Sequence, residues 1–438
     1  CGTLHSNTTG NCNIAIGKQA LCKNTTGCYN TAMGHNALFG SLSGCDNFAA
    51  GQSALCSNWG GCYNTAIGYR ALCSNTTGKY NHAVGYQALK SNTEGTYNNA
   101  KGSHALYSNT TGWHNNGIGF YALYSNTTGY YNNALGRDAL YNNTTANHNN
   151  AIGCKALYSN TTGEYNTAIG KEALRVSLSG DHNFAAGLCA LYSNYGGCTN
   201  AAIGFCALAC NTTGSCNTAI GCKTLLVNTT GDGNNGIGHE VLFSNTTGGS
   251  NNGFGKYALG YNTTGSLNTG VGQTAGMSNT DGSCNAFYGY AAGRFLADGS
   301  TAASSPDNST YIGACTRTYS VSSSNETVIG HCALGCGTNT TSIGNCDVTD
   351  TYINGNVCAS GNGYFACVIA GGYFEEKAAS PKLAEYPTGS IVVIGRDGHL
   401  VLSTKENDKK VFGVTKQGVC QPIVLGAEPV LVTGDVKV

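Results

Sequence analysis

Apolar and polar positions follow one short pattern that recurs every 17 residues along most of this chain. The unit reads N-T-A-I-G-x-x-A-L-x-S-N-T-T-G-x-Y, and glycine occupies every multiple of 17 up to Gly289. Asparagine stands four residues before each of these glycines, from Asn13 to Asn285, so seventeen repeats follow one another without an insertion or deletion. Both sets are expected to form structural ladders, and they include Asn13, Asn30, Asn81, Asn132 and Asn166, and Gly17, Gly34, Gly85, Gly136 and Gly170.

A fixed period of this length predicts a β-solenoid. A helical repeat needs about 33 residues for a helix pair, about twice the length of this unit. Two short strands joined by two turns fit the unit, and its two glycines suit the turns. Equivalent residues of successive rungs then lie about 4.8 Å apart, the spacing of hydrogen-bonded strands. We therefore expect an all-β fold, a parallel β-solenoid or β-roll of seventeen 17-residue rungs, in which the asparagines bond to the rungs above and below.

The N-T-T-G segment predicts the turn that closes each rung. A type I turn favours Asn at its first position and Gly at its fourth, as in the segments Asn109 to Gly112 and Asn160 to Gly163. The glycine at each multiple of 17 is expected at the other bend, where a positive φ or a close backbone approach excludes a side chain.

Both faces of the predicted strands are apolar, which favours a multimer. Neighbours such as Ala151 and Ile152, or Ala156 and Leu157, should point to opposite faces of a strand. The narrow interior of a rung can hold one of these rows, so the other row needs cover from another molecule. We expect a homotrimer around one axis and leave higher fibre assembly open.

The N-T-A-I-G core with its downstream A-L pair resembles the head repeats of trimeric autotransporter adhesins, and also related repeats in viral and phage tail-fibre proteins. The resemblance covers residues 1 to about 290. It implies a left-handed parallel β-roll trimer. The repeat of this chain is longer than that of the adhesin heads, which leaves the handedness and the loop geometry open.

The sequence divides into three regions. The regular shaft spans residues 1–290. After Gly289 the register changes: a Ser/Ala-rich stretch leads to Pro306, and looser T-x-I-G motifs follow at shrinking spacing. We therefore expect a degenerate, tapering β region over residues 291–371. From residue 372 to 438, Lys, Glu, Val and Pro replace Asn, Thr and Gly, which predicts a small β-rich C-terminal domain.

This C-terminal region is similar to the intramolecular-chaperone autoprocessing domain that ends some phage appendages. The segments that carry the resemblance are Lys409 to Val414 and Pro429 to Gly434. It implies a domain that registers a trimer, and Thr415 stands where a hydroxyl residue follows the G-V pair in that family. Because the chain starts at Cys1 without a signal-like segment and stops at Val438, we expect a mature or excised piece of a longer protein.

Composition and the absence of known motifs argue against several classes of function. Lys+Arg and Asp+Glu both number 22, so no basic field for nucleic acid is expected. No apolar run approaches the roughly 18 to 20 residues that a membrane-spanning helix needs. No Ser/His/Asp set, phosphate loop or paired carboxylate cluster stands out. The sequence therefore predicts no enzyme, no cofactor, no metal site and no membrane insertion.

The 23 cysteines indicate an oxidising setting. Several share one position of the repeat or flank one turn, within reach of disulfide bonds inside or between chains. The C-x-x-C spacing of zinc sites is absent, so metal binding is the weaker alternative. The candidate disulfide cysteines are Cys22, Cys28, Cys45, Cys56, Cys62, Cys73, Cys189, Cys198, Cys206, Cys216 and Cys222.

N-x-T sequons recur in the N-T-T-G turns, where asparagine serves either as a glycan acceptor or as a turn residue. Acceptors about 4.8 Å apart would crowd bulky sugars, which favours the turn interpretation and leaves sparse or alternating glycans open. The candidate acceptors are Asn308, Asn325 and Asn339, together with Asn109 and Asn126.

Aromatic residues also recur in phase. One expected ladder contains Tyr107 and Tyr124, and another contains Tyr63 and Tyr80. Such ladders stiffen a rod or bind glycans. His114, His148 and His182 share one phase at two-rung intervals, too far apart to hold one metal within a chain.

Together these features predict an extracellular structural or adhesive fibre on a cell surface or a virion. Such a rod projects many shallow surfaces, which suits a host glycan or a surface receptor as a partner. The alternatives are a fibre precursor whose C-terminal chaperone domain cleaves itself, and a glycan-binding β-helix module.

Overall fold

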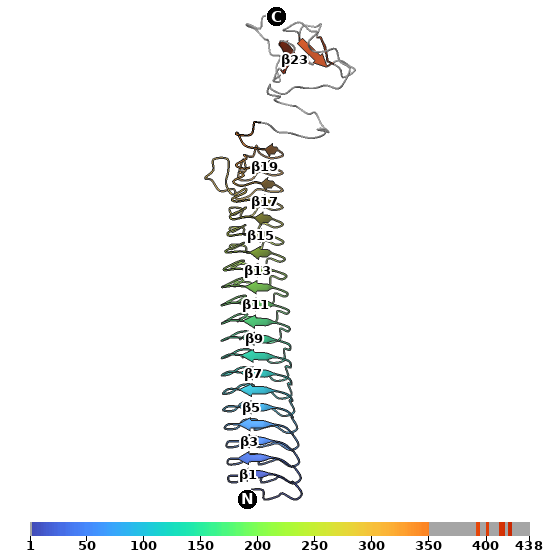
Figure 1. Cartoon of the computed structure of the whole chain (residues 1–438), viewed down its shortest axis with the longest axis vertical. Coiled ribbons are helices and arrows are strands. Elements are labelled where there is room, and N and C mark those ends of the chain that lie inside the picture. The colour runs from blue at the N-terminus through green and yellow to red at the C-terminus, as the bar shows by residue number, and fades with distance from the viewer. Residues whose placement is uncertain (1, 350–390, 395–399, 403–410, 417–418, 423–438) are drawn as a thin grey trace. The chain divides into compact units, whose positions relative to one another are not determined.

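The computed structural model describes residues 2–349 and, further on, residues 391–394, 400–402, 411–416 and 419–422. The chain divides into two compact units, Cys1–Thr349 and Asp350–Val438. The first unit is a column of stacked coils, each of them one 17-residue repeat over most of its length (Figure 1). Strands of successive coils pair in parallel, which confirms the predicted all-β parallel solenoid.

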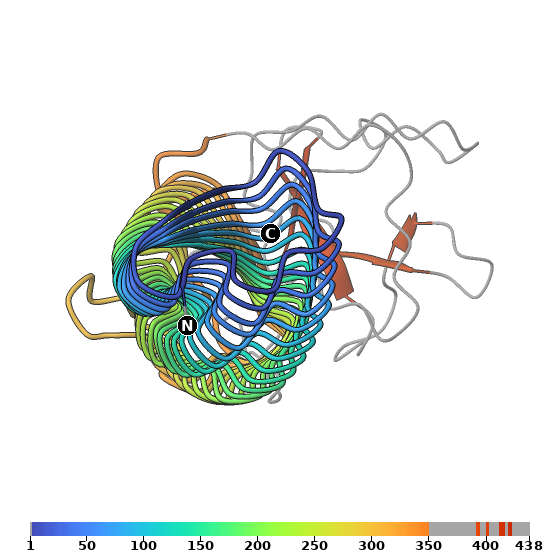
Figure 2. The same ribbon diagram turned by 90° about the horizontal axis from the view of Figure 1, so that it is seen from below.

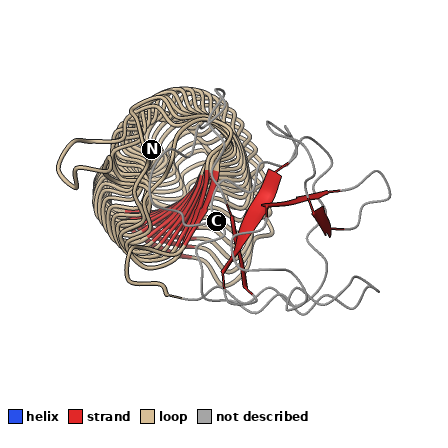
Figure 3. Ribbon diagram, turned by 90° about the horizontal axis from the view of Figure 1, so that it is seen from above, coloured by secondary structure: helices blue, strands red, loops and turns tan. Residues whose placement is uncertain are grey.

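Each regular coil contributes one strand of three residues to a single sheet on one side of the column (Figure 3). The register steps by one repeat, so that Ala151 pairs with Ala168 and Ile152 with Ile169. The strands are β1 Ile14–Ile16, β2 Thr31–Met33, β3 Phe48–Ala50, β4 Thr65–Ile67, β5 His82–Val84, β6 Asn99–Lys101, β7 Asn116–Ile118, β8 Asn133–Leu135, β9 Asn150–Ile152, β10 Thr167–Ile169, β11 Phe184–Ala186, β12 Ala201–Ile203, β13 Thr218–Ile220, β14 Asn235–Ile237, β15 Asn252–Phe254, β16 Thr269–Val271 and β17 Ala286–Tyr288.

The prediction of a second strand in each rung was wrong. The A-L segment instead runs through tight turns, because Lys155 and Leu157 have φ of 57° and 49°, in the left-handed region that breaks the pleat of a strand. Ala156 and Leu157 are therefore both fully buried and do not face apart as expected. In the true strand, Ala151 is buried and Ile152 is 38% exposed, as predicted.

The interior of each coil is narrow and holds three apolar columns. The strand supplies one alanine, such as Ala151, and the turn segment supplies an Ala-Leu pair, such as Ala156 and Leu157. Their equivalents are buried in nearly every regular coil. The turn segment is also bonded to its neighbour, because the Leu157 N–H donates to the Ala173 carbonyl at 3.0 Å. Backbone pairing between coils thus extends well beyond the sheet.

The predicted asparagine ladder is confirmed, and we call it the first ladder. The Asn166 N–H donates to Asn149 Oδ1 at 3.0 Å, and Asn166 Nδ2 donates to the Gly180 carbonyl at 2.8 Å. In turn, Asn166 Oδ1 accepts from the Asn183 N–H at 2.9 Å. From Asn30 onward the ladder asparagines are buried, and each of them joins its coil to the neighbouring coils.

A second ladder runs through the asparagines of the N-T-T-G turns. Asn109 Nδ2 donates to Asn92 Oδ1 at 2.8 Å and to the Gly112 carbonyl at 3.0 Å. Asn126 repeats the pattern, donating to Asn109 Oδ1 at 2.8 Å. The turn lies where the sequence placed it, but a buried side-chain amide links its first residue to its fourth.

Two serines interrupt the second ladder. Ser41 and Ser177 occupy the asparagine position and are fully buried, and their hydroxyl groups have no hydrogen-bond partner. The Oδ1 atoms of the preceding asparagines, Asn24 and Asn160, also lack one. A serine is too short to reach the coil above or below it.

The glycines at multiples of 17 form a column with no space for a side chain. Gly153 has φ of 136°, and a Cβ on it would lie 2.4 Å from the carbonyl oxygen of Gly170. Such a φ is open to glycine and strained for other residues. The column therefore explains the invariance of this glycine.

Stacking continues past Gly289 although the sequence register changes. The strands β18 Thr310–Ile312, β19 Thr327–Ile329 and β20 Thr341–Ile343 extend the same sheet. The coil between β17 and β18 is longer, since Phe287 pairs with Tyr311. Its extra residues form a hairpin in which Phe295 pairs with Ala302, and this hairpin projects from the column (Figure 2). The expected boundary at 371/372 lies outside the described residues.

The described residues of the second unit form one antiparallel sheet, in the order β22-β21-β23-β24. Its strands are β21 Ile391–Ile394, β22 Leu400–Leu402, β23 Val411–Lys416 and β24 Val419–Pro422. Thr415 lies in β23 and pairs with Cys420, and self-cleavage at this residue stays a prediction. Among the described parts of the chain, no helix has the length and apolar character to span a membrane.

The glycine column predicts a position-specific effect of an added methyl group. Gly153→Ala should lower the stability of the column by about 3 kcal/mol or more, from the left-handed backbone and the clash with Gly170. Gly163→Ala is the matched control, because its Cβ would also lie close to a carbonyl oxygen, 2.6 Å from that of Gly180, whereas its backbone does not have a positive φ. Ala146 already occupies the equivalent position of another coil, so Gly163→Ala should cost less, about 1 kcal/mol. Urea denaturation followed by circular dichroism measures both, and equal midpoints would contradict the account.

The interrupted second ladder predicts a stabilising substitution. Ser177→Asn should supply a donor for Asn160 Oδ1 and an acceptor for Asn194, and so raise the stability by about 1 to 3 kcal/mol, the cost of a buried unsatisfied polar group. Ser177→Ala removes the unpartnered hydroxyl but leaves Asn160 Oδ1 without a donor, so it should stabilise the column less than Ser177→Asn does. Thermal denaturation compares the two, and a lower melting temperature for Ser177→Asn would count against the ladder.

Candidate functional site

Because equivalent residues of successive coils lie next to one another, each exposed position of the repeat forms a column along the surface. The outward residue of each strand forms the most continuous apolar column, which we call the apolar stripe. Its members include Ile16, Met33, Ile67, Leu135, Ile152, Ile169, Ile203, Ile237, Phe254, Val271, Tyr288, Ile312 and Ile343, all of them exposed. Lys101 interrupts the stripe in β6.

Large side chains two residues further on broaden the stripe. Tyr86, Phe120, Leu188 and Phe205 follow the glycine bend and are between 42% and 48% exposed. Contiguous exposed apolar surface of this length marks an interaction site in a soluble protein. The stripe is therefore the first candidate functional surface.

The aromatic columns were predicted correctly, and one is longer than expected. Rings stack without a gap from Tyr63 through Tyr97 and His114 to His182, with centroids 4.7 to 5.1 Å apart and planes tilted by 3° to 23°. Each ring covers the face of the next. The column therefore presents ring edges, hydroxyl groups and imidazole nitrogens to a ligand, with no open face on which a sugar could stack.

The histidines of this column do not approach one another. Tyr131 stacks between His114 and His148, and Tyr165 between His148 and His182. Across residues 2–349, no group of three or more His, Cys, Asp or Glu side chains is placed to hold a metal ion. The aromatic rings act here as spacers.

A second aromatic column runs from Tyr107 to Tyr158, with centroids 5.1 to 5.2 Å apart. Lys90 ends it, with its ammonium 4.9 Å from the Tyr107 ring centroid and 2.8 Å from the Tyr107 hydroxyl. Partial burial, together with this lysine, lowers the pKa of the adjacent His104. This shift favours the neutral form of the His104 imidazole.

The candidate cysteines fall into columns as their spacing indicated. The Cys28 N–H donates to the sulfur of Cys45, and the Cys45 N–H to that of Cys62, both at 3.3 Å. Cys56 and Cys73 form a second pair. All the cysteines within residues 2–349 are free thiols, and disulfide formation stays a prediction.

The second cysteine cluster is only partly brought together. Cys189 and Cys206 share one column, and their thiols are close enough to interact. Cys222 lies outside this column but close enough to Cys206 to raise the pKa of its thiol, after the larger effect of burial. Cys198 and Cys216 occupy other positions of the repeat, neither of which carries a cysteine on the adjacent coil. Cys22 is buried and shares the repeat position of Cys56, two coils further along.

The Cys56 and Cys73 pair is the most perturbed of these thiols. A hydrogen bond from Cys56 lowers the pKa of Cys73 to about 7, while the same contact raises the pKa of Cys56. Nearby Arg70 also favours the Cys73 thiolate. Near pH 7 the Cys73 thiol is therefore partly ionised beside the Cys56 thiol, an arrangement from which a disulfide forms when an oxidant is supplied.

The sequons separate into two kinds. Asn109 and Asn126 are fully buried, and their Nδ2 atoms donate to neighbouring coils and turns. A sugar on either nitrogen has no room in the folded coil, which favours their interpretation as turn residues. Asn308, Asn325 and Asn339 are exposed, and Asn325 Nδ2 donates to Asn339 Oδ1 at 3.0 Å. Glycosylation at these three positions stays a prediction.

A buried carboxylate that sequence reasoning missed lies near the end of the column. Glu326 occupies a position of the first ladder and is fully buried. Its Oε2 accepts from the Tyr311 hydroxyl at 3.0 Å and the Thr318 hydroxyl at 2.8 Å, and its Oε1 from the Gly337 N–H at 2.8 Å. Burial raises the pKa of the Tyr311 hydroxyl. These contacts give Glu326 a structural role in closing the last coils.

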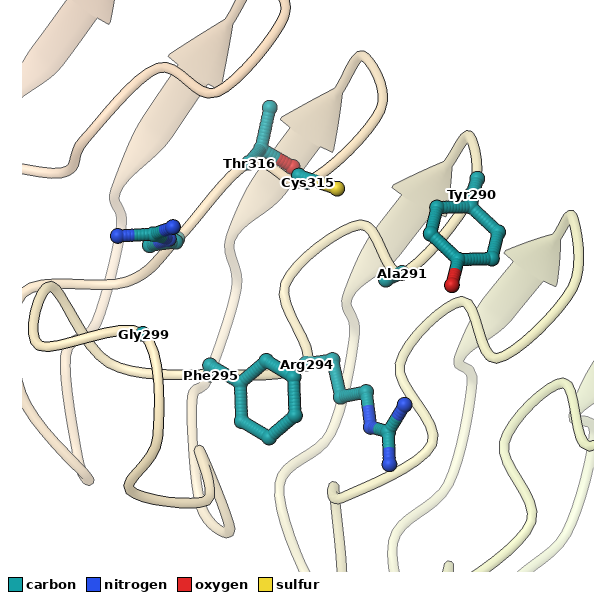
Figure 4. A pocket seen from close by; sticks show the side chains of 8 residues that line it. Tyr290, Ala291, Arg294, Phe295, Gly299, Cys315 and Thr316 are labelled. Carbon is teal, nitrogen blue, oxygen red and sulfur yellow. The ribbon is translucent and has the colours of Figure 1, made fainter.

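One cavity also escaped prediction. It lies beneath the inserted hairpin, where Tyr290, Arg294 and Arg317 contribute to its wall (Figure 4). The signal in the sequence was the break in register after Gly289, which was interpreted as a boundary. Comparison with protein-family models, with curated proteins and with solved structures gives no match for this chain.

The thiol pair predicts a pH dependence. Because the pKa of Cys73 is lowered from 9.0 to about 7, its alkylation by iodoacetamide should rise with pH and reach half its maximal rate near pH 7. Peptide mapping by mass spectrometry measures the rate at each pH. Cys56→Ala removes the hydrogen-bond donor and should move the midpoint upward, toward that of an ordinary thiol. A Cys73 midpoint near 9 in the unmodified chain would contradict the predicted contact.

Proposed function

We propose that this chain is a structural and adhesive fibre protein that acts outside the cell, on a cell surface or a virion. The observation that carries the proposal is the continuous parallel pairing from β1 to β20. A stack whose invariant residues serve bonding between layers is suited to spanning distance. Its buried asparagines form hydrogen bonds between layers, and its glycines allow the layers to approach closely.

A homotrimer is the assembly that we propose for this fibre. The apolar stripe supports it, because a column of exposed Ile, Leu and Phe side chains is unfavourable in water. Three copies around an axis would bury all three stripes. The resemblance of the N-T-A-I-G repeats to trimeric autotransporter adhesin heads, and to viral and phage tail fibres, supports the same arrangement.

Adhesion is the proposed role of the remaining columns. Each aromatic column presents one ring edge per coil. A long ligand lying along the column would therefore contact the same kind of group many times. Repeated weak contacts of this kind give strong binding through effective concentration. A host glycan or a surface receptor is therefore the proposed partner.

The proposed trimer is tested by charges placed in the stripe. The unmodified chain should sediment as a trimer of the 45.0 kDa subunit. The double variant Ile152→Lys with Ile169→Lys should sediment as a smaller species, because burying unpaired ammonium groups is costly. Analytical ultracentrifugation measures both masses.

The control places the same charges on the same two coils but on another face. Thr145 and Thr162 are exposed turn residues, and the double variant Thr145→Lys with Thr162→Lys should remain trimeric. A monomeric unmodified chain at micromolar concentration would overturn the trimer. A trimer that persists in the stripe variant would remove the stripe from its interface.

A further inference from the structure

Three cysteines occupy one repeat position on three successive coils, and we call them the thiol column. Cys28, Cys45 and Cys62 are each separated by one repeat of 17 residues. All three are free, half-buried thiols. Asn11 precedes them at this position and Lys79 follows them, so the column contains three sulfur atoms in a row.

The backbone holds the three sulfurs in the same way. Sγ of Cys28 accepts from the Asn11 N–H at 3.3 Å, and the sulfurs of Cys45 and Cys62 each accept from the cysteine N–H of the preceding coil at the same distance. Each thiol also donates to the carbonyl oxygen two residues before it, at 3.4 to 3.6 Å. The same contacts on successive coils give each sulfur the same place on its own coil.

The spacing of the sulfurs therefore follows the spacing of the coils. Hydrogen-bonded strands lie about 4.8 Å apart, and the rings of Tyr63 and Tyr80, one residue along from the thiol column, have centroids 4.9 Å apart. Two thiolates that hold one ion on the line between them, with metal–sulfur bonds of about 2.3 Å, lie about 4.6 Å apart. The two spacings nearly coincide, so adjacent coils can share an ion without a shift of the backbone.

We propose that the thiol column binds monovalent copper, with one Cu(I) ion between each pair of adjacent sulfurs. Thiolates are the soft ligands that select Cu(I). Three protons leave the thiols as two ions enter, and the Cys45 sulfur then bonds to both ions. The hydrogen bonds from the backbone N–H groups remain and stabilise the negative sulfurs.

Two-coordinate binding agrees with the rest of the described structure. Zinc in a structural site takes four protein ligands. Among residues 2–349 no group of three or more His, Cys, Asp or Glu side chains is placed to hold a metal ion. A linear ion needs only two sulfurs, and the thiol column supplies two such pairs.

A disulfide is the competing product of these thiols, and the spacing disfavours it. The Cβ atoms of a disulfide lie about 3.5 to 4.5 Å apart, less than the step of about 4.8 Å between coils. A disulfide would also use two of the three sulfurs and leave the third. Cys56 and Cys73 differ from this column, because their thiols form a hydrogen bond with each other.

Copper binding by the full chain, reduced and kept free of oxygen, tests the proposal. A chelator fixes the free concentration of Cu(I), iodoacetamide alkylates the thiols that remain, and peptide mass spectrometry reports the protection of each cysteine. The thiol column should be protected at a Cu(I) concentration about tenfold or more below that which protects Cys284, because the second sulfur binds within the same molecule. Cys284 is the internal control, an exposed thiol with no cysteine at its position on the adjacent coils.

Two variants of the same column separate copper binding from folding. Cys45→Ser leaves Cys28 and Cys62 two coils apart, about 10 Å, and should abolish their protection at low Cu(I) concentration. Cys28→Ser leaves the adjacent pair Cys45 and Cys62 and should keep one ion. Both variants should fold, because Ser215 and Ser266 occupy this position in other coils and accept the N–H of the preceding coil at 3.1 and 3.0 Å.

The difference between these two variants decides the proposal. Equal protection in both, or protection of the thiol column only at the concentration that protects Cys284, would overturn it. A disulfide formed within the column in place of copper binding would also overturn it. The site lies within one chain and goes beyond the proposed fibre, so sedimentation of the same preparation tests the trimer separately.

Discussion

Hydrogen bonding between coils in a constant register is the constraint on which the rest of the structure depends. Strand pairs such as Ala151 and Ala168, the first ladder and the second ladder all require the same offset of one repeat. A slip in one coil would separate all three sets at once. The sequence therefore tolerates wide variation at exposed positions and none at the glycine column over its seventeen regular repeats.

The same constraint gives the surface its character. Because each coil repeats the position of the last, any exposed residue type becomes a column, whether apolar, aromatic or thiol. The apolar stripe, the ring column that ends at His182 and the Cys56 and Cys73 pair all arise in this way. Distinct local sites need a departure from the period, and the longer coil before β18 supplies one. The cavity lined by Arg294 and Arg317 lies there.

Repeat length and invariant residues were enough to predict the solenoid, the first ladder and the columns, because contacts in such a fold join neighbouring layers only. The path of the chain within a coil was harder to predict from the sequence. Leucine gives no sign that it adopts φ near 50°, yet Leu157 and its equivalents do so, and this converts an expected strand into turns. Glu326 and the cavity were missed because they lie after Gly289, where the 17-residue period ends. No constant spacing there relates one coil to the next.

Electron cryomicroscopy of the purified chain tests the central claim most directly. The account predicts density layers about 4.8 Å apart, one repeat per layer, with Gly153 and Gly170 on adjacent layers and the Asn166 amide inside the coil. Density in which these two glycines lie on non-adjacent layers, or in which the asparagine side chains face solvent, would contradict it.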